Sequence, residues 1–263
     1  MMKKTAFAGL LVMAVLVGCA TNPMTGRSQL MLVSEGEVMN ASEQAYVSQI
    51  AEQRKLGKLE TNARILSRVR GIANRVIAQA VKIRPETARW NWQVNVIDEP
   101  EVNAYAMAGG KIAVYTGLLN QINPTDDELA QVLGHEIAHA LAGHSREKMS
   151  IAMGTDLAIA AYGATQAASD NTQQALAAAA LLAVRLPNNR LMESEADRIG
   201  IEIAAKAGYD PNAAVSLWTK MSRKQNGGVP QFLSTHPSDS ARINALSDLV
   251  PRMMPYYRAA RNQ

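Results

Sequence analysis

The segment from His135 to His139 constrains this chain more than any other feature, because it places histidine, glutamate and histidine at helical spacing in an apolar stretch. Side chains four residues apart on a helix differ by about 40° in azimuth, so both imidazoles leave the same face. Two imidazoles that converge in this way can bind one Zn²⁺ at about 2.0–2.1 Å. Glu136 points about 100° away, which suits a base acting on the attacking water rather than a third ligand. The pattern therefore predicts a zinc site with hydrolytic chemistry.

A third protein ligand must come from elsewhere in the sequence. His144 lies five residues beyond the second motif histidine, far around a continuous helix, and we interpret it as a helix-end residue near the negative end of the dipole. A later acidic segment is a better source, because Glu193 and Asp197 are four apart and share a helix face. We expect Glu193 to be the third ligand and Asp197 to accept the ring N–H of a ligand histidine. Glu195 points to another side, and we assign it to a solvated acidic surface.

The rest of the pattern predicts an α+β domain that is mostly helical. Ser34 and Glu37 have the spacing of a capping box at the start of a long helical region, and Thr125 or Asp126 caps the helix that carries the histidine motif. Helices are expected over about 34–80, 125–143 and 187–208, and short strands over 92–97, 103–107 and 111–115. The strand at 103–107 is expected at the edge of a small sheet.

Residues 150–185 are rich in alanine and nearly uncharged, which predicts one or two helices. Two interpretations stay open for them: helices that pack in the core, or a lid over the active site. No internal repeat of roughly 20–50 residues is present, so residues 34–263 are expected to form a single domain.

Residues 1–18 have the features of a signal peptide. Two lysines precede an apolar run that is shorter than the about 20 residues needed to span a bilayer. The run ends just before Cys19, the one cysteine of the chain, in a pattern that resembles a bacterial lipobox. We expect cleavage before Cys19, its lipidation, and a tether over 19–33; the alternative is an ordinary signal peptide with a chance cysteine. Ala20 rather than aspartate follows, which favours the periplasmic side of the outer membrane.

Charge and composition exclude several classes of protein. The chain carries 27 basic and 23 acidic residues, a net charge of +4, without a long basic run, so nucleic acid is not an implied partner. A hydrophobic content of 48% and a charged content of 19% argue against a disordered chain and against a polytopic membrane protein. A single cysteine cannot form an intrachain disulfide.

Several motifs together resemble the M48 metallopeptidases, a family that includes Ste24-type and HtpX-type membrane proteases, mitochondrial Oma1 and periplasmic lipoproteins. The resemblance rests on His135-Glu136-x-x-His139, Glu193-x-x-x-Asp197, and Ser234-Thr235-His236-Pro237 followed by Arg242. Further similar segments are Asn22-Pro23-x-Thr25-Gly26-Arg27, Asn103-Ala104-Tyr105-Ala106, Gly110-Lys111-Ile112 and Thr116-Gly117-Leu118-Leu119. The similarity covers nearly the whole mature chain. It is greatest to the lipoprotein members, because the sequence shows neither the membrane helices of the Ste24 and HtpX types nor a tetratricopeptide tail.

The resemblance implies a zincin-like (gluzincin) core, in which a small sheet accompanies the motif helix. It implies one Zn²⁺ per chain, bound by His135, His139 and Glu193, with Glu136 as the catalytic residue and Asp197 as the residue that orients a ligand histidine.

The resemblance also assigns roles around the substrate. His236 would donate a hydrogen bond to the oxyanion formed from the scissile carbonyl, and Arg242 would order the site or bind the peptide backbone. An extended substrate would pair with an edge strand made of Asn103, Ala104, Tyr105 and Ala106.

The expected activity is zinc-dependent endopeptidase cleavage of periplasmic or outer-membrane proteins in protein quality control, with unfolded or misassembled envelope proteins as substrates. The alternative is a periplasmic chaperone-like or binding lipoprotein whose zinc site is latent or structural. A structural zinc usually has four protein ligands, often including cysteine, whereas three are expected here, which leaves one position open. Zinc-dependent proteolysis by the purified protein distinguishes the two functions.

Overall fold

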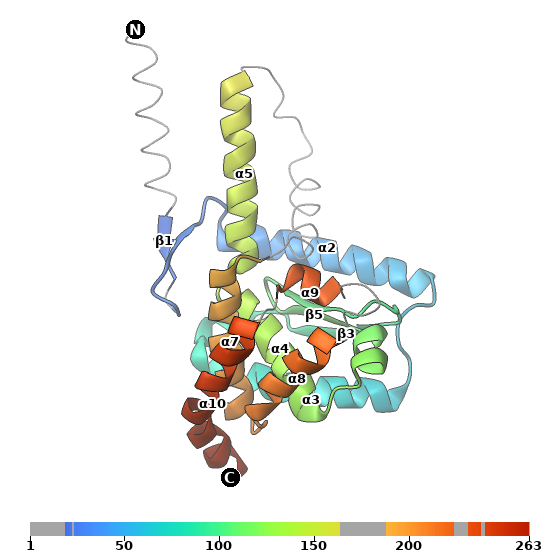
Figure 1. Cartoon of the computed structure of the whole chain (residues 1–263). Coiled ribbons are helices and arrows are strands. Elements are labelled where there is room, and N and C mark those ends of the chain that lie inside the picture. Colours follow the sequence, from blue (N-terminus) through green and yellow to red (C-terminus); the bar gives the residue numbers. More distant parts are fainter. Residues whose placement is uncertain (1–18, 23, 164–187, 224–230, 238–239, 263) are drawn as a thin grey trace.

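The computed structural model describes residues 19–22, 24–163, 188–223, 231–237 and 240–262. Its strands are β1 (Cys19–Thr21), β2 (Ser28–Leu30), β3 (Gln93–Ile97), β4 (Ala104–Met107) and β5 (Lys111–Tyr115). Its helices are α2 (Glu35–Lys55), α3 (Ala63–Ile83), α4 (Asp126–Leu141), α5 (His144–Gly163), α7 (Arg190–Lys206), α8 (Asn212–Arg223), α9 (Gln231–Thr235) and α10 (Ser240–Arg261), with short helical turns at Pro85–Arg89 and Leu118–Ile122. The described part is mostly helical, as predicted, and α5 projects from its body (Figure 1). The expected signal peptide and the alanine-rich stretch after Gly163 lie outside the described residues.

Three strands form a sheet beside the motif helix, in the order β3-β5-β4. Strand β5 is buried along its whole length, and it pairs in parallel with β3 and antiparallel with β4. Gln93 lies opposite Lys111 in the first pair, and Ala104 lies opposite Val114 in the second. Strand β4 has β5 as its one partner among the described strands, so the edge strand expected at 103–107 is confirmed.

The sheet is covered by helices on both faces (Figure 1). Alternate side chains of β5 enter two different cores, because successive residues of a strand point to opposite faces. Ile112 and Val114 pack in the larger core, with residues of α3 and α4, whereas Ala113 and Tyr115 pack in the smaller core, with residues of α2. Helix α4 is thereby held between the sheet and the C-terminal helices.

The helical region expected over 34–80 consists of two helices, α2 and α3. The capping box is confirmed at the start of α2: the Glu37 N–H donates to the Ser34 hydroxyl at 3.2 Å, and the Ser34 N–H donates to the Glu37 carboxylate at 2.8 Å. The chain leaves the helix at Gly57, whose φ of 69° lies in the left-handed region. Leu59 then forms a bridge to the end of β3. The break between the helices allows Leu59 to pair with β3, which lies far away in the sequence. Helical periodicity within 34–80 gives no information about such a pairing.

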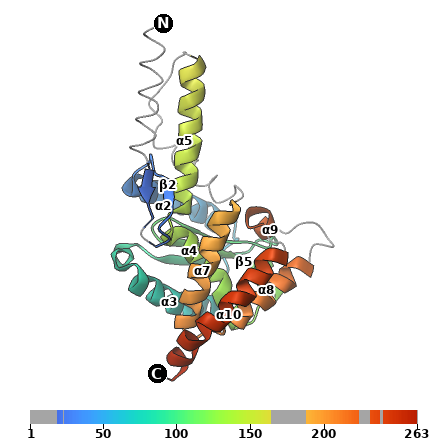
Figure 2. The same ribbon diagram turned by 60° about the vertical axis from the view of Figure 1, so that its left-hand side comes forward.

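Helices α4 and α7 cross at very short range, and this contact positions the site. Thr125 rather than Asp126 caps α4. Gly134 and Gly200 meet at the crossing, and a Cβ on Gly200 would lie 2.7 Å from the backbone nitrogen of His135. Two positions without side chains therefore let the helix backbones touch. Helices α8 and α10 pack beside this pair (Figure 2).

In the segment 19–33, expected to form a tether, residues 19–22 and 24–33 lie against the domain, and β1 and β2 pair as an antiparallel hairpin. Asn22 and Gln29 are buried, and their side chains donate to the carbonyl of Ala142, at the end of α4, at 2.7 and 3.1 Å. This hairpin is thus anchored to the helix that carries the histidine motif. No helix in the described part of the chain has the length and apolar character needed to cross a membrane.

Candidate active site

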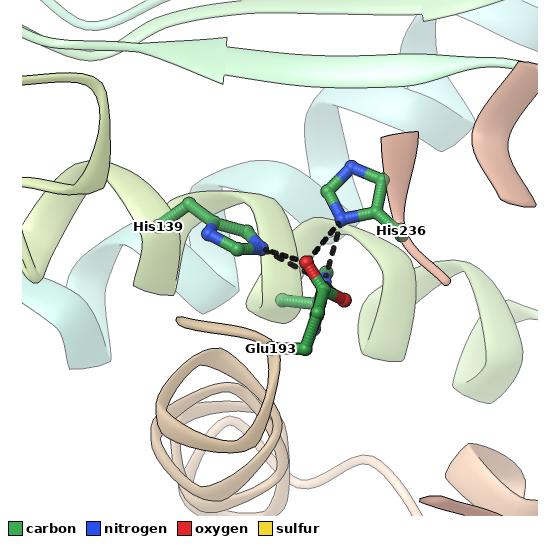
Figure 3. A group of neighbouring side chains, drawn as sticks. His139, Glu193 and His236 are labelled. Atoms are coloured by element: carbon green, nitrogen blue, oxygen red, sulfur yellow. Dashed lines mark hydrogen bonds and ion pairs between the residues drawn. The ribbon is translucent and has the colours of Figure 1, made fainter. Parts of the chain in front are cut away.

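Four buried side chains from separate elements converge at the centre of the domain. His135 and His139 come from α4, Glu193 from the first turn of α7, and His236 directly follows α9. Nε2 of His135 lies 3.0 Å from Nε2 of His139, and these two nitrogens lie 3.3 Å from Oε2 and Oε1 of Glu193, respectively. Figure 3 shows the rings of His139 and His236 directed toward the Glu193 carboxylate. The structure therefore brings together the three residues expected to bind the metal.

The separations of these donor atoms fit a tetrahedral metal ion. Bonds of about 2.0–2.1 Å around a tetrahedral centre place neighbouring ligand atoms about 3.3 Å apart. The pairs formed by His135, His139 and Glu193 are 3.0–3.3 Å apart. Burial opposes ionisation of Glu193, but the neighbouring His236 and His135 hold the pKa of its carboxyl well below its ordinary value. Imidazole nitrogens with an anionic oxygen, and no sulfur, suit zinc and chemically similar divalent ions.

His236 lies closer to the metal-ligand atoms than expected for a residue that contacts only the substrate. Its Nδ1 is 3.1 Å from Nε2 of His135 and 3.0 Å from Oε1 of Glu193, so it belongs to the same group of possible ligands. Asn188 also approaches this nitrogen, at 3.2 Å. The other ring nitrogen of His236 lies 3.3 Å from Oε1 of Glu136. His236 is thus placed to act as a fourth ligand or as a hydrogen-bond donor beside the base.

Behind the ligands, Asp197 and Arg242 form a buried ion pair against His135. Nδ1 of His135 lies 3.0 Å from Oδ1 of Asp197, the geometry of a carboxylate that orients a metal-binding imidazole. Arg242 binds both oxygens of Asp197, at 2.7 and 2.8 Å, and its Nη1 lies 2.6 Å from Glu193. Its guanidinium also lies 3.7 Å from the ring centre of Trp218. Of the two roles expected for Arg242, these contacts favour ordering the site.

Glu136 faces a small cavity beside the ligands. Tyr105 and Ala106 of β4 line this cavity, whereas Asn103 and Ala104, the other residues of the expected substrate strand, do not. Glu136 is 3% exposed, and its Oε1 has no hydrogen-bond partner among the described residues. Burial raises the pKa of its carboxyl. A buried carboxylate with an unsatisfied oxygen next to the candidate ligands suits a group that accepts a proton from water.

Two predictions about neighbouring residues are wrong. Glu195 does not lie on a solvated surface: its side chain is 13% exposed and pairs with Arg27 and with His144, both at 2.9 Å. His144 does not lie far from the motif, because its Nδ1 is 2.7 Å from Nδ1 of His139. The chain turns at Gly143, whose φ is 67°, so His144 begins α5 and returns toward the site. The prediction for His144 assumed that one continuous helix carries both His139 and His144, and the turn between them makes that assumption wrong.

Three residues near the site were not singled out by the sequence. Lys148 and Asn188 line the cavity beside Glu136. Arg27 binds Glu195, on the side of α7 that was predicted to face solvent. The two residues are 168 positions apart in the sequence. The one sequence signal for Arg27 was its place in a segment that resembles the family. The spacing of residues in the sequence does not predict a contact between two residues that are more than a hundred positions apart.

Comparison with known proteins agrees with this arrangement. The family model for "Peptidase family M48" matches residues 63–250. The mitochondrial metalloendopeptidase OMA1 of Bos taurus is 31% identical over 261 residues, which cover 95% of this chain and 49% of that protein. The OMA1 protein of Arabidopsis thaliana is 39% identical over 158 residues, 60% of this chain and 31% of that protein. The metalloprotease LoiP of Escherichia coli is 30% identical over 149 residues, 56% of this chain and 58% of that protein.

The chain spans about half the length of the first two curated relatives that it matches. The family match covers the stretch that supplies all four candidate ligands. The α+β, mostly helical and zincin-like fold predicted from the sequence is confirmed by the element order together with this match. The chain belongs to peptidase family M48.

Proposed function

We propose that this chain is a zinc-dependent metalloendopeptidase. The observation that carries the proposal is the position of Glu136, which lines the same cavity as His139. Its Oε1 is buried and makes no hydrogen bond within the described residues, although it lies 3.3 Å from Nε2 of His236. Zinc held by His135, His139 and Glu193 would polarise the attacking water and the scissile carbonyl. Relatives named metalloendopeptidase and metalloprotease support the same assignment.

In the proposed reaction, Glu136 takes a proton from the attacking water and passes it to the nitrogen of the leaving amine. Burial raises the pKa of its carboxyl and so helps it to hold the proton between the two transfers. His236, with its Nε2 3.3 Å from Glu136, donates a hydrogen bond to the developing oxyanion. Asp197 and Arg242 keep the ligands oriented.

Strand β4 lies at the edge of the sheet formed by the described strands, and an extended stretch of substrate would pair along it. Tyr105 and Ala106 line the cavity that contains Glu136, so backbone pairing along this edge delivers a peptide bond to the base. Main-chain hydrogen bonds select little among side chains, which suits unfolded or misassembled proteins as substrates. We therefore propose envelope proteins as the substrate class and protein quality control as the role.

The proposed location is the periplasmic side of the outer membrane. This proposal rests on the lipobox-like sequence before Cys19. Cys19 is exposed at the start of β1, so a lipid attached to its thiol would not disturb the core.

Substitution of Glu136 by glutamine tests the proposed activity. Glu136→Gln is expected to keep bound zinc and to lose cleavage of an unfolded protein such as casein, because the amide cannot take the proton. Glu52, exposed on α2, supplies the matched control: Glu52→Gln keeps both properties. Casein cleavage at the wild-type rate by Glu136→Gln would refute the mechanism. The same variant in the periplasm serves as a trap, and the proteins that stay bound identify the substrate.

A second candidate function follows from the four-membered ligand group. If His236 is a zinc ligand, the site is closed in the manner of a structural zinc, and the chain is a chaperone-like or binding lipoprotein. His236→Phe then lowers zinc affinity and destabilises the fold, and the wild type cleaves no casein. For a peptidase, His236→Phe keeps zinc and lowers the rate of cleavage.

A further inference from the structure

Each histidine of the motif is supported by a carboxylate from α7, but by a different route. For His135 the support is direct, since its Nδ1 lies 3.0 Å from Asp197. For His139 the carboxylate acts through a second imidazole, that of His144. Nδ1 of His139 lies 2.7 Å from Nδ1 of His144, and Nε2 of His144 lies 2.9 Å from Glu195. Helix α7 therefore supplies one metal ligand and both supporting carboxylates.

A single arrangement of protons satisfies this chain of contacts. Nε2 of His139 faces the other ligand atoms and must present its lone pair to a metal ion, so Nδ1 carries the proton and donates to Nδ1 of His144. His144 then carries its own proton on Nε2 and donates it to Glu195. Glu195 accepts this hydrogen bond together with two from Arg27.

Arg27 completes these contacts from the hairpin of β1 and β2. Its Nε and Nη2 lie 2.9 and 3.0 Å from the two oxygens of Glu195, and its Nη1 and Nη2 lie 2.7 and 2.6 Å from those of Glu147 on α5. Gln29 donates to the same Glu147 carboxylate at 2.9 Å. One planar guanidinium thus joins α5 to α7, in a two-carboxylate geometry that suits arginine and not lysine.

We propose that the hairpin of β1 and β2 is part of the active unit, with Arg27, Glu195 and His144 as positioning residues that fix the tautomer and ring orientation of His139. This inference rests on the proposed function, because the orientation of His139 matters when that residue binds a metal ion. The hairpin precedes the stretch 63–250 that the family model matches, although it contacts the end of the motif helix.

A purely structural clamp would behave differently. Loss of a clamp lowers the unfolding temperature and leaves the zinc affinity of the folded molecules unchanged, whereas loss of a positioning residue lowers that affinity. His144 allows a sharp substitution pair. Glutamine accepts a hydrogen bond through its oxygen and donates through its nitrogen, as the neutral imidazole does, whereas leucine does neither.

The experiment uses the full chain and measures the dissociation constant for zinc by competition with a chelator, with circular dichroism to verify folding. His144→Leu is expected to weaken zinc binding about 10–100-fold, and His144→Gln to restore most of the loss. Arg27→Gln acts one hydrogen bond further from the metal, so a loss of about 3–10-fold is expected. Arg68→Gln is the matched control: it breaks an exposed ion pair of 2.7 Å with Asp126 and is expected to keep the wild-type affinity.

Wild-type zinc affinity in folded His144→Leu and Arg27→Gln would overturn the proposal. Equal losses in His144→Leu and His144→Gln would also overturn it, because the hydrogen bonds would then be irrelevant. If His144→Leu does not fold, the comparison of Arg27→Gln with Arg68→Gln decides. Zinc binding without proteolysis in the wild type refutes the proposed function but leaves this comparison valid, so the two failures are distinguishable.

Discussion

Replacement of Gly200 by alanine is expected to disable the metal centre without removing a ligand. The added Cβ would lie 2.7 Å from the backbone nitrogen and 2.8 Å from the Cα of His135. Both atoms belong to the backbone of α4, so neither can turn aside as the end of a flexible side chain does. Helix α7 must therefore move away from α4 as a whole.

The size of this movement follows from the contact distances. Ordinary contact begins at 3.4 Å, so α7 must retreat by about 0.7 Å. Glu193 lies on the same helix, and metal–ligand distances tolerate a deviation of only about 0.2 Å. We expect zinc affinity to fall at least as far as the about 10–100-fold typical of a lost supporting residue. Overpacking costs about 1–3 kcal/mol, which the helix propensity of alanine offsets by about 1 kcal/mol, so the metal-free protein should lose about 2 kcal/mol or less.

Two assays test this reasoning: the zinc dissociation constant, and urea unfolding of the metal-free protein. Gly71 in α3 supplies the control, because no atom lies within 4 Å of an added Cβ there. Gly71→Ala is expected to keep zinc affinity and to stabilise the fold by about 0.5–1 kcal/mol. Wild-type zinc affinity and casein cleavage in Gly200→Ala would show that the crossing of α4 and α7 does not set the ligand geometry.

Three further predictions concern the same centre. Asp197→Ala should lower zinc affinity about 10–100-fold, and unweakened binding in a chelator competition would contradict its supporting role. Removal of metal with a chelator should lower the unfolding temperature, since free zinc at 100 times its dissociation constant contributes about 2.7 kcal/mol; equal temperatures with and without zinc would refute a folded-state site. The pKa of Glu195 is lowered from 4.5 to about 2, so its contribution to stability is present above pH 4.5 and lost as the pH falls toward 2. Solvent screening limits this contribution to about 1–2 kcal/mol, and Glu195→Gln should flatten the pH dependence of the urea midpoint in that window.

Local sequence patterns were sufficient to predict most of the helices and strands and part of the candidate active site. The spacing of His135 and His139 places both rings on one face of any helix, so their convergence needed no tertiary information. The same holds for the capping box at Ser34, because it involves residues three apart, whereas the choice of Thr125 over Asp126 as the cap of α4 came from the structure. The segment 111–115, which follows Gly109 and Gly110, was likewise predicted to be a strand, although not one at the centre of the sheet.

The sequence by itself thus determined the elements, the helical metal-binding motif and the chemistry of the donor atoms, since each depends on residues a few positions apart. Only the tertiary structure determined which side chains surround the candidate metal ligands. The turn at Gly143 returns His144 to the motif, and the hairpin carries Arg27 onto Glu195. Those contacts join residues that backbone geometry and packing bring together, and the period of a helix carries no information about a partner on another element.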